Sequence, residues 1–291
     1  MSSVDAPDGA QIAARGFQRY EGERSGVPGA IRSVTWQAIR STLGLGRPAK
    51  NKIFPVISVA IAYVPAIVFI GLAVLIPGDI IDGPTYPEYF GFIISAIVLF
   101  VALVAPEVLV ADRRNGMLAM YLSTPLHRGT YLVAKMLAVT ATLGLVTLGP
   151  LILVLLGYTF DGSGPDGFVN WLIVLARILL SGVAVSAALM SISMAASSLT
   201  DRRAFAAIGV VLVVLATPIL SGALVDGADL SENWRLLDVF SMPFELVYRI
   251  FGDAGNFPAV STVAVVAVNV LWTLSGLAIV AWRYSRLVIA R

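Results

Sequence analysis

The chain has 291 residues, of which 58% are hydrophobic and 13% are charged, and its formal net charge is +2. Soluble domains average about 45–50% apolar and about 25% charged residues, so this composition excludes an ordinary soluble enzyme. The small positive charge is spread over several loops and gives no indication of nucleic-acid binding. There is no cysteine, which excludes disulfides and thiolate metal sites. Several windows exceed about 18 apolar residues, which predicts an all-α polytopic membrane protein.

Two segments precede the first long apolar run. Residues 1–28 contain glycine, proline and charges without apolar periodicity, which predicts a mobile tail. Residues 29–52 predict an amphipathic helix followed by a hinge. Its apolar face carries Ile31, Val34, Ala38 and Thr42, with Trp36 and Leu43 beside this face and Arg32 and Arg40 outside it. This pattern favours an interfacial helix that lies on the membrane with its arginines near headgroups. The alternative is a short helix that packs only against protein.

Six apolar segments are long enough to cross a bilayer. They lie at about residues 53–76, 90–110, 136–157, 178–198, 205–224 and 259–282, within one transmembrane domain that covers residues 53–291. The third and fifth contain the internal prolines Pro150 and Pro218, which membrane helices tolerate.

The basic residues of the loops orient these six spans. Lys and Arg residues number eight in residues 1–52, four in 111–135, two in 199–204 and three after Trp282. These loops lie on one side and together hold 17 of the 20 basic residues. The opposite loops hold only Arg235 and Arg249. The positive-inside rule therefore predicts that both termini are cytoplasmic and that the protein resides in the cytoplasmic membrane.

The long loop before the last span, residues 225–258, is more apolar than a simple connector. Its apolar residues recur at helical spacings: Trp234, Leu237, Phe240, Phe244, Val247 and Phe251. This spacing predicts one or two short helices that dip into the outer leaflet. A loop folded over the outer end of the bundle is the alternative.

Motifs for hydrolytic or metal chemistry are missing from the sequence. It contains no Gly-x-x-x-x-Gly-Lys-Ser/Thr, so the chain is not expected to hydrolyse ATP itself. It contains no Gly-x-Ser-x-Gly, and the single histidine, His127, lies in a charged loop, where we expect a solvent or partner contact. The spans lack the ligands of a metal site. We therefore predict no catalytic residue, metal or cofactor in this chain.

Arg177 is the one charged residue that could lie inside a span. An intramembrane charge would indicate a translocation path. If the fourth span begins at Ile178, Arg177 instead extends to the outer surface, and this is our prediction. The fourth span also carries small residues at helical spacing: Ser181, Ala184, Ala188, Ser191, Ala195 and Ser198. They predict close helix packing, with a substrate-facing stripe as the alternative.

A polar segment at residues 106–135 separates the second span from the third. It contains an acid, Asp112, a basic pair, Arg113 and Arg114, and a short helical pattern with an apolar face. This segment resembles the coupling helix in the permease subunit of type-2 ATP-binding cassette (ABC) exporters. The resemblance rests on the acid-x-x-x-Gly-x-Leu spacing and on a Ser-Thr-Pro turn, and the residues it involves are Asp112, Arg113, Arg114, Asn115, Gly116, Met117, Leu118, Tyr121, Leu122 and Pro125. Six spans with an interfacial helix before them and short outer helices before the last span also match that family.

The resemblance implies two permease subunits, identical or paralogous, above two cytoplasmic ATPase subunits that bind ATP and Mg. Because this cytoplasmic helix has an apolar face, we further hypothesise that Asp112, Arg113 and Arg114 form rim charges of the ATPase contact, with Met117, Leu118 and Tyr121 at its apolar centre. The apolar spans favour a lipidic or amphiphilic substrate. Two other functions stay open: a permease that transports nothing and transmits force to an extracytoplasmic partner, and an ATP-independent secondary transporter.

Overall fold

The computed structural model describes residues 26–46, 52–75 and 83–287, and over these residues the chain is helical without strands. Six helical stretches are long and apolar enough to cross a membrane: Ile53–Leu75, Tyr86–Arg114, Arg128–Asp161, Gly167–Leu199, Arg203–Gly227 and Thr262–Ser285. The prediction of an all-α protein with six spans is confirmed. The predicted mobile tail lies outside the described residues, except for its last three positions.

The helices divide into two halves along the chain. The first half contains α1 (Gly26–Thr42), α2 (Ile53–Leu75), α3 (Tyr86–Leu99), the π-helix η2 (Phe100–Val104), α4 (Glu107–Arg114), α5 (Met117–Leu122) and α6 (Arg128–Asp161). The second half contains α7 (Gly167–Leu199), α8 (Arg203–Gly222), the π-helix η3 (Ala223–Gly227), the 3-10 helix η4 (Glu232–Leu237), α9 (Met242–Phe251) and α10 (Thr262–Ser285). Short helices therefore occupy the predicted positions before the last span. Their placement in a leaflet remains a prediction.

Several helices begin earlier than the apolar pattern indicates. α6 begins at Arg128 instead of residue 136, and α7 begins at Gly167 instead of residue 178. An apolar window finds only the part of a helix that lies in hydrocarbon, whereas the helix continues through polar residues to its cap. For α6 that cap is His127, whose side chain accepts a hydrogen bond from the Thr130 N–H. α1 begins at Gly26 because Pro28 fits a first turn.

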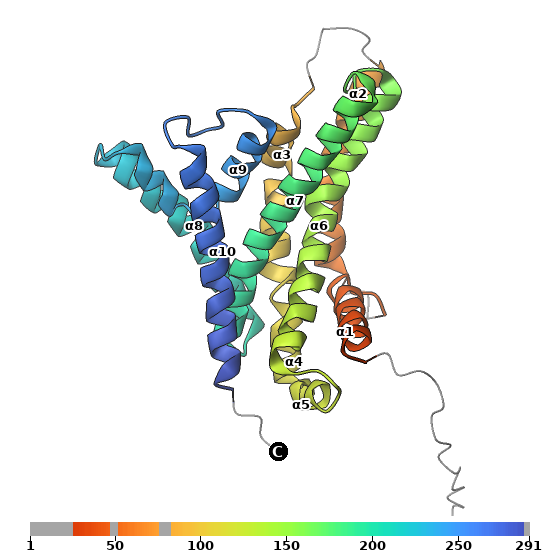
Figure 1. Cartoon of the computed structure of the whole chain (residues 1–291), viewed down its shortest axis with the longest axis vertical. Helices are drawn as coiled ribbons and strands as arrows, with labels where there is room; N and C mark the ends of the chain where they lie inside the picture. Colours follow the sequence, from red (N-terminus) through yellow and green to blue (C-terminus); the bar gives the residue numbers. More distant parts are fainter. Residues whose placement is uncertain (1–25, 47–51, 76–82, 288–291) are drawn as a thin grey trace, which may run out of the picture.

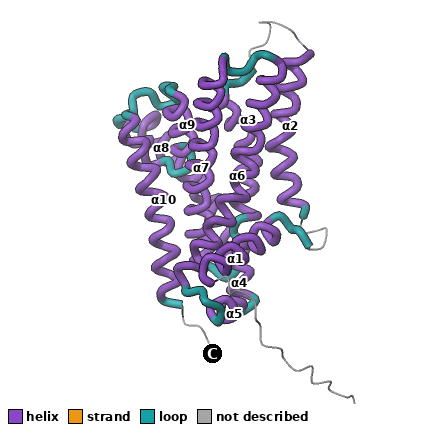
Figure 2. Tube along the Cα trace, turned by 45° about the vertical axis from the view of Figure 1, so that its right-hand side comes forward, coloured by secondary structure: helices purple, strands orange, loops and turns teal. Residues whose placement is uncertain are grey.

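Different short helices and helix ends gather at the two ends of the bundle. Figure 1 shows α1, α4, α5 and the C-terminal end of α10 at one end, which we call the α5 end, and α9 near the other, the α9 end. The turned view in Figure 2 gives the same grouping of α1, α4 and α5. Short connections after α7 and before α6 bring further helix ends to the α5 end. Residues far apart in the sequence thus meet there.

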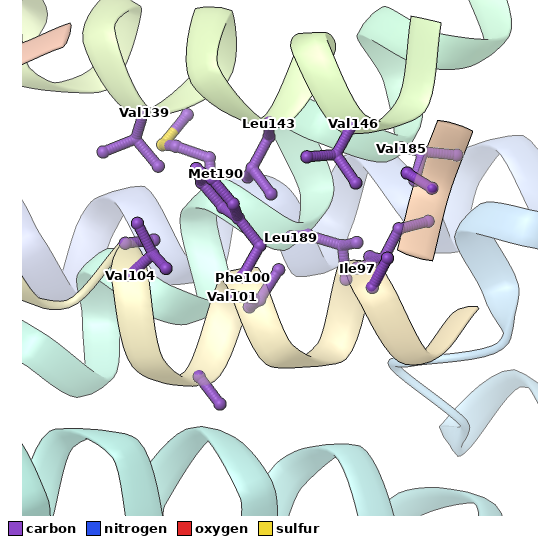
Figure 3. Close-up of a cluster of buried hydrophobic side chains, with 14 of the residues drawn as sticks. Ile97, Phe100, Val101, Val104, Val139, Leu143, Val146, Val185, Leu189 and Met190 are labelled. Carbon is purple, nitrogen blue, oxygen red and sulfur yellow. The ribbon is translucent and has the colours of Figure 1, made fainter. Parts of the chain in front are cut away.

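The core lies between the second, third and fourth spans. Figure 3 shows Phe100 and its neighbours from α3 and η2 facing α6 residues such as Leu143 and α7 residues such as Leu189. α7 packs closely against its neighbours: a Cβ added to Gly276 of α10 would lie 2.9 Å from the Ser191 carbonyl oxygen. Ser181, Ala188, Ser191 and Ser198 are buried, which agrees with the predicted packing role of the small residues.

Candidate functional site

The polar segment between the second and third spans forms two short helices at an angle set by a glycine. α4 ends at Arg114, Asn115 follows, and α5 begins after Gly116. Gly116 has φ +64°, a left-handed conformation that glycine adopts without strain. A Cβ at this position would meet no atom within 4 Å, so the backbone conformation and not space requires the glycine. We call residues 107–125 the α4–α5 segment.

A buried ion pair holds the α4–α5 segment to the third span. The Lys135 Nζ of α6 lies 2.6 Å from the Asp112 Oδ2, and the Tyr131 hydroxyl donates a hydrogen bond of 2.8 Å to the same oxygen. The two charged side chains are 4% and 10% exposed, respectively. Removing either partner would leave a buried uncompensated charge, which typically costs about 3–5 kcal/mol. The pair therefore fixes α4 on α6.

Tyr121 of α5 packs against the same α6 residues that bind Asp112 of α4. Its ring lies 5.6 Å from that of Tyr131, and the Lys135 Nζ lies 5.3 Å from the Tyr121 ring centroid. Burial, together with the nearby Asp112 carboxylate, raises the pKa of the Tyr121 phenol above its usual value. The phenol therefore stays neutral, and α5 is seated on the same cluster that holds α4.

Arg113 binds the end of the fourth span. Its Nη1 donates to the Ser198 carbonyl at 2.7 Å, its Nη2 donates to the Ser197 and Thr200 carbonyls, and its Nε lies 3.4 Å from the Asp201 carboxylate. The last carbonyls of a helix have no partner within the helix, and a cation there also complements the helix dipole. The buried guanidinium thus caps α7 from the α4–α5 segment.

Two further arginines connect this region to the fifth and sixth spans. Arg203, at the start of α8, donates to the Leu103 carbonyl at 2.7 Å and lies 2.9 Å from the Glu107 carboxylate. Arg128, at the start of α6, donates to carbonyls at the end of α10, those of Tyr284, Ser285 and Leu287. Arg113, Arg128 and Arg203 are called the junction arginines below. Through them the ends of α7, α8 and α10 converge on the loop between the second and third spans.

The prediction that Asp112 and Arg113 are rim charges is wrong. Both side chains are buried against the bundle, because α4 turns them towards α6 and the end of α7. Arg114, Asn115 and Pro125 are exposed, as are Met117 and Met120 at 37% and 56%. Leu118, Tyr121 and Leu122 are half-buried, and the first two pack against the chain's own core, so the free apolar surface of α5 is centred on its methionines.

The site residues predicted from the sequence did not include Met120, Arg128 and Arg203, although Arg128 lies within the polar segment at residues 106–135. Met120 lies three residues after Met117, so helical spacing could have placed both on one exposed face. The two arginines flank helix ends, where they were counted only as topology signals. Their carbonyl partners lie 157 and 100 residues away in the sequence, and no local pattern indicates them.

A small polar cavity of about 110 Å³ separates α1 from the α4–α5 segment. Its lining includes Gln37 and Thr42 of α1, Asn115, and the buried Asp112–Lys135 pair. Over the described residues, no group of three or more His, Cys, Asp or Glu side chains is placed to hold a metal ion.

Arg177 lies at the α9 end and is bound to protein. α7 is continuous from Gly167, and the half-buried Arg177 donates through Nη1 to the Phe251 carbonyl at 3.1 Å. Its guanidinium also lies 6.0 Å from the Phe251 ring centroid. Phe251 is the last residue of α9, so Arg177 caps that helix. We predicted that the Arg177 side chain extends to the outer surface as an unpaired charge. In the structure it binds the end of α9 instead.

Comparison with known proteins agrees with this architecture. No curated protein matches the chain. A family model described as "ABC-2 family transporter protein" matches residues 11–287, which includes all six spans and the α4–α5 segment. Membership implies a multi-pass membrane permease, not itself an enzyme, that works with an ABC ATPase partner. The chain belongs to the ABC-2 transporter permease family.

Proposed function

We propose that this chain is the permease subunit of an ABC exporter in the cytoplasmic membrane, driven by a separate ATPase. The ATPase binds ATP and Mg and presses on the α4–α5 segment, and a second permease, identical or paralogous, completes the transport path. The six spans then alternate between inward and outward states. A two-state element of this kind shifts only if its partner binds the two states with different affinity.

The observation that carries this proposal is the convergence of helix ends on the α4–α5 segment. Asp112 holds the segment on α6, Arg113 joins it to α7, and Arg203 joins its first turn to α8. Arg128, which follows the segment, holds the end of α10. A displacement of the segment therefore acts on four spans through charged and buried contacts, and α2 follows because it packs on α6.

The exposed methionines of α5 supply the surface for the ATPase. Met117 and Met120 lie on a helix that extends beyond the end of the bundle, away from the spans (Figure 1). Methionine side chains are flexible and polarizable, so they suit a contact that must persist through a conformational change. Arg114, exposed beside them, is suited to guide encounter with the partner.

A lipidic or amphiphilic substrate is supported by a groove between α7, α9 and α10. It has a volume of about 200 Å³ and an apolar lining that includes Ala184, Ala188, Leu246 and Leu274. Asn269 and Thr273 add a few polar groups to this lining. Apolar walls with few polar groups are typical of sites for hydrophobic ligands.

Exchange of one exposed α5 residue tests the ATPase contact. Met120→Asp should abolish co-purification of the ATPase and its stimulation by the permease, because a desolvated carboxylate costs several kcal/mol in an apolar contact. The control is Asn233→Asp, which adds the same charge at an exposed position of the α9 end. If Met120→Asp binds and stimulates the ATPase like the parent, α5 is not the docking helix.

The proposed orientation is tested separately by cysteine labelling, because the parent chain has no cysteine. In intact cells, Ser163→Cys and Asp229→Cys should react with a membrane-impermeant thiol reagent, whereas Asn115→Cys and Asp201→Cys should not. Reaction of Asn115→Cys from outside would place the α5 end outside the cell and contradict the proposal.

A further inference from the structure

α1 has one face on the protein and one face that the described residues leave open. Val34 and Ala38 are buried, and Val34 packs with Leu126, just before α6, and with Ala134 in the second turn of α6. The Thr35 hydroxyl donates to the Ala134 carbonyl at 3.1 Å, which fixes α1 along α6. The opposite face carries Arg32, Trp36 and Arg40 at intervals of four residues, all exposed. Trp36 is 61% exposed, a large fraction for an indole ring.

A groove runs between this open face and α6. Its volume is about 880 Å³, which is within the range of ligand sites of about 300–1,000 Å³. The lining is mainly apolar and comprises Pro28, Gly29, Ile31, Arg32, Ser33, Thr35, Trp36, Ile39 and Leu137. Arg32 is the single charged residue in that lining, and no acidic residue accompanies it.

The groove continues into a surface of the third span that faces the membrane. Leu137 is 51% exposed and lies between Val133 and Leu145, which are 46% and 39% exposed. Together with the exposed Ala141 these residues recur every four positions and form one stripe along α6. Since α6 crosses the membrane, acyl chains contact this stripe. An acyl chain that lies on the stripe can extend into the groove at Leu137.

The charge at the groove determines which lipid suits it. Within the part of the chain that the structure describes, Arg32 takes part in no ion pair or hydrogen bond. A guanidinium binds phosphate oxygens through two parallel hydrogen bonds. An indole ring beside it suits the boundary between headgroups and acyl chains. The geometry points to an anionic phospholipid site, with the phosphate on Arg32 and Ser33 and one acyl chain against Trp36, Ile39 and Leu137.

Occupancy of this site has a consequence for the α4–α5 segment, and that consequence rests on the proposed function. α1 lies between the lipid groove and the α4–α5 segment, because its buried Val34 belongs to the cluster against which Tyr121 packs. A lipid in the groove packs against the outer face of α1. It thereby keeps α1 in place against the α4–α5 segment. Anionic lipid is therefore expected to raise the stimulation of ATPase by the permease.

Quenching of Trp36 by brominated lipids tests the site without reference to transport. The full chain is placed in nanodiscs that contain phosphatidylcholine with a minor fraction of brominated phosphatidylglycerol or brominated phosphatidylcholine. The Trp36 contribution is the difference between the parent and Trp36→Phe. At equal fractions we expect brominated phosphatidylglycerol to be favoured at Trp36 by about fivefold, as one basic residue at a lipid surface provides.

Two arginine variants decide whether this preference belongs to the groove. Arg32→Gln should abolish the preference for phosphatidylglycerol, while Arg40→Gln, on the same face but outside the groove lining, should retain most of it. An unchanged Trp36 emission maximum in phosphatidylcholine shows that Arg32→Gln keeps α1 folded. Equal quenching by both lipids in the parent, or an undiminished preference in folded Arg32→Gln, would overturn the site. If the preference is as expected and ATPase stimulation does not respond to lipid, the site stands and only its link to the α4–α5 segment fails.

Discussion

The two ends of the bundle use the same side-chain chemistry over different distances in the sequence. At the α9 end, the buried Glu245 accepts from Arg249, four residues away, and from the backbone N–H of Asn256. Arg249 also donates to the Phe257 carbonyl, eight residues away. The buried Asp238 accepts from the N–H groups of the residues that lead into α9. Most polar contacts that close this end therefore join residues close in the sequence.

At the α5 end, arginines bind carbonyls that are distant in the sequence. Arg113 and the Ser198 carbonyl are 85 residues apart, Arg203 and the Leu103 carbonyl 100, and Arg128 and the Ser285 carbonyl 157. A mainly local polar cluster thus stabilises the α9 end, where Arg177 adds one long-range contact, whereas three arginines join distant helix ends at the α5 end. We therefore expect the α5 end to move as a unit. If the two ends differ in this way, substitutions that cost the same stability at each end should differ in their effect on stimulation of the partner ATPase.

The largest effect is expected from the buried ion pair. Lys135→Met leaves the Asp112 carboxylate buried without its partner, and we expect a loss of about 3–5 kcal/mol in the free energy of unfolding. The double variant Asp112→Leu/Lys135→Met should recover most of this loss. Thermal unfolding of the purified complex measures both. If the single variant is as stable as the parent, the pair does not hold α4 on α6.

A matched pair of arginines separates stability from coupling. The side chains of Arg113 and Arg249 are 6% and 10% exposed, and both donate to several carbonyl or carboxylate oxygens. Lysine cannot reproduce these forked contacts, so each Arg→Lys variant should lose about 2 kcal/mol of stability. Only Arg113→Lys should also reduce the stimulation of the partner ATPase. An equal reduction in both variants would remove the distinction between the two ends.

A matched pair of glycines makes the same test with a smaller change. Gly116 at the α5 end and Gly162 after α6 both have positive φ, and neither would place a Cβ within 4 Å of another atom. Alanine at either position should cost about 1–2 kcal/mol, because the left-handed conformation is strained for residues with a Cβ. We expect Gly116→Ala to weaken ATPase stimulation while the subunits still co-purify. Gly162→Ala should leave stimulation unchanged.

The smallest effect is expected at Arg177. Arg177→Leu removes one hydrogen bond to the Phe251 carbonyl, so stability should fall by about 1 kcal/mol with ATPase stimulation intact. Arg177→Lys should lose less, since a cation remains near the end of α9. Purified complexes compared by thermal unfolding and ATPase assay give both readings. If the Arg177→Leu complex is folded but its ATPase is no longer stimulated by the permease, Arg177 has a functional role in coupling.

The class, the six spans and the side on which the basic loops gather could all be predicted from the sequence. These features follow from local composition: a run of about 20 apolar residues crosses a bilayer whatever it packs against. The apolar face of α1 and the short helices before the last span were likewise visible as periodicity, because side chains three or four residues apart share a helical face. The acid-x-x-x-Gly-x-Leu spacing of the α4–α5 segment, together with the order of spans and short helices, was enough to indicate the family.

Tertiary packing, by contrast, selects which charged residues of the segment face inward. Asp112, Arg113 and Arg114 are consecutive in the sequence, and nothing local distinguishes them. Only the packing of α4 between α6 and the end of α7 buries the first two and leaves Arg114 exposed. The partners of Arg128 and Arg203 were equally hidden, because a backbone carbonyl at a helix end carries no sequence signature. Those contacts exist only where the fold brings the helix ends together.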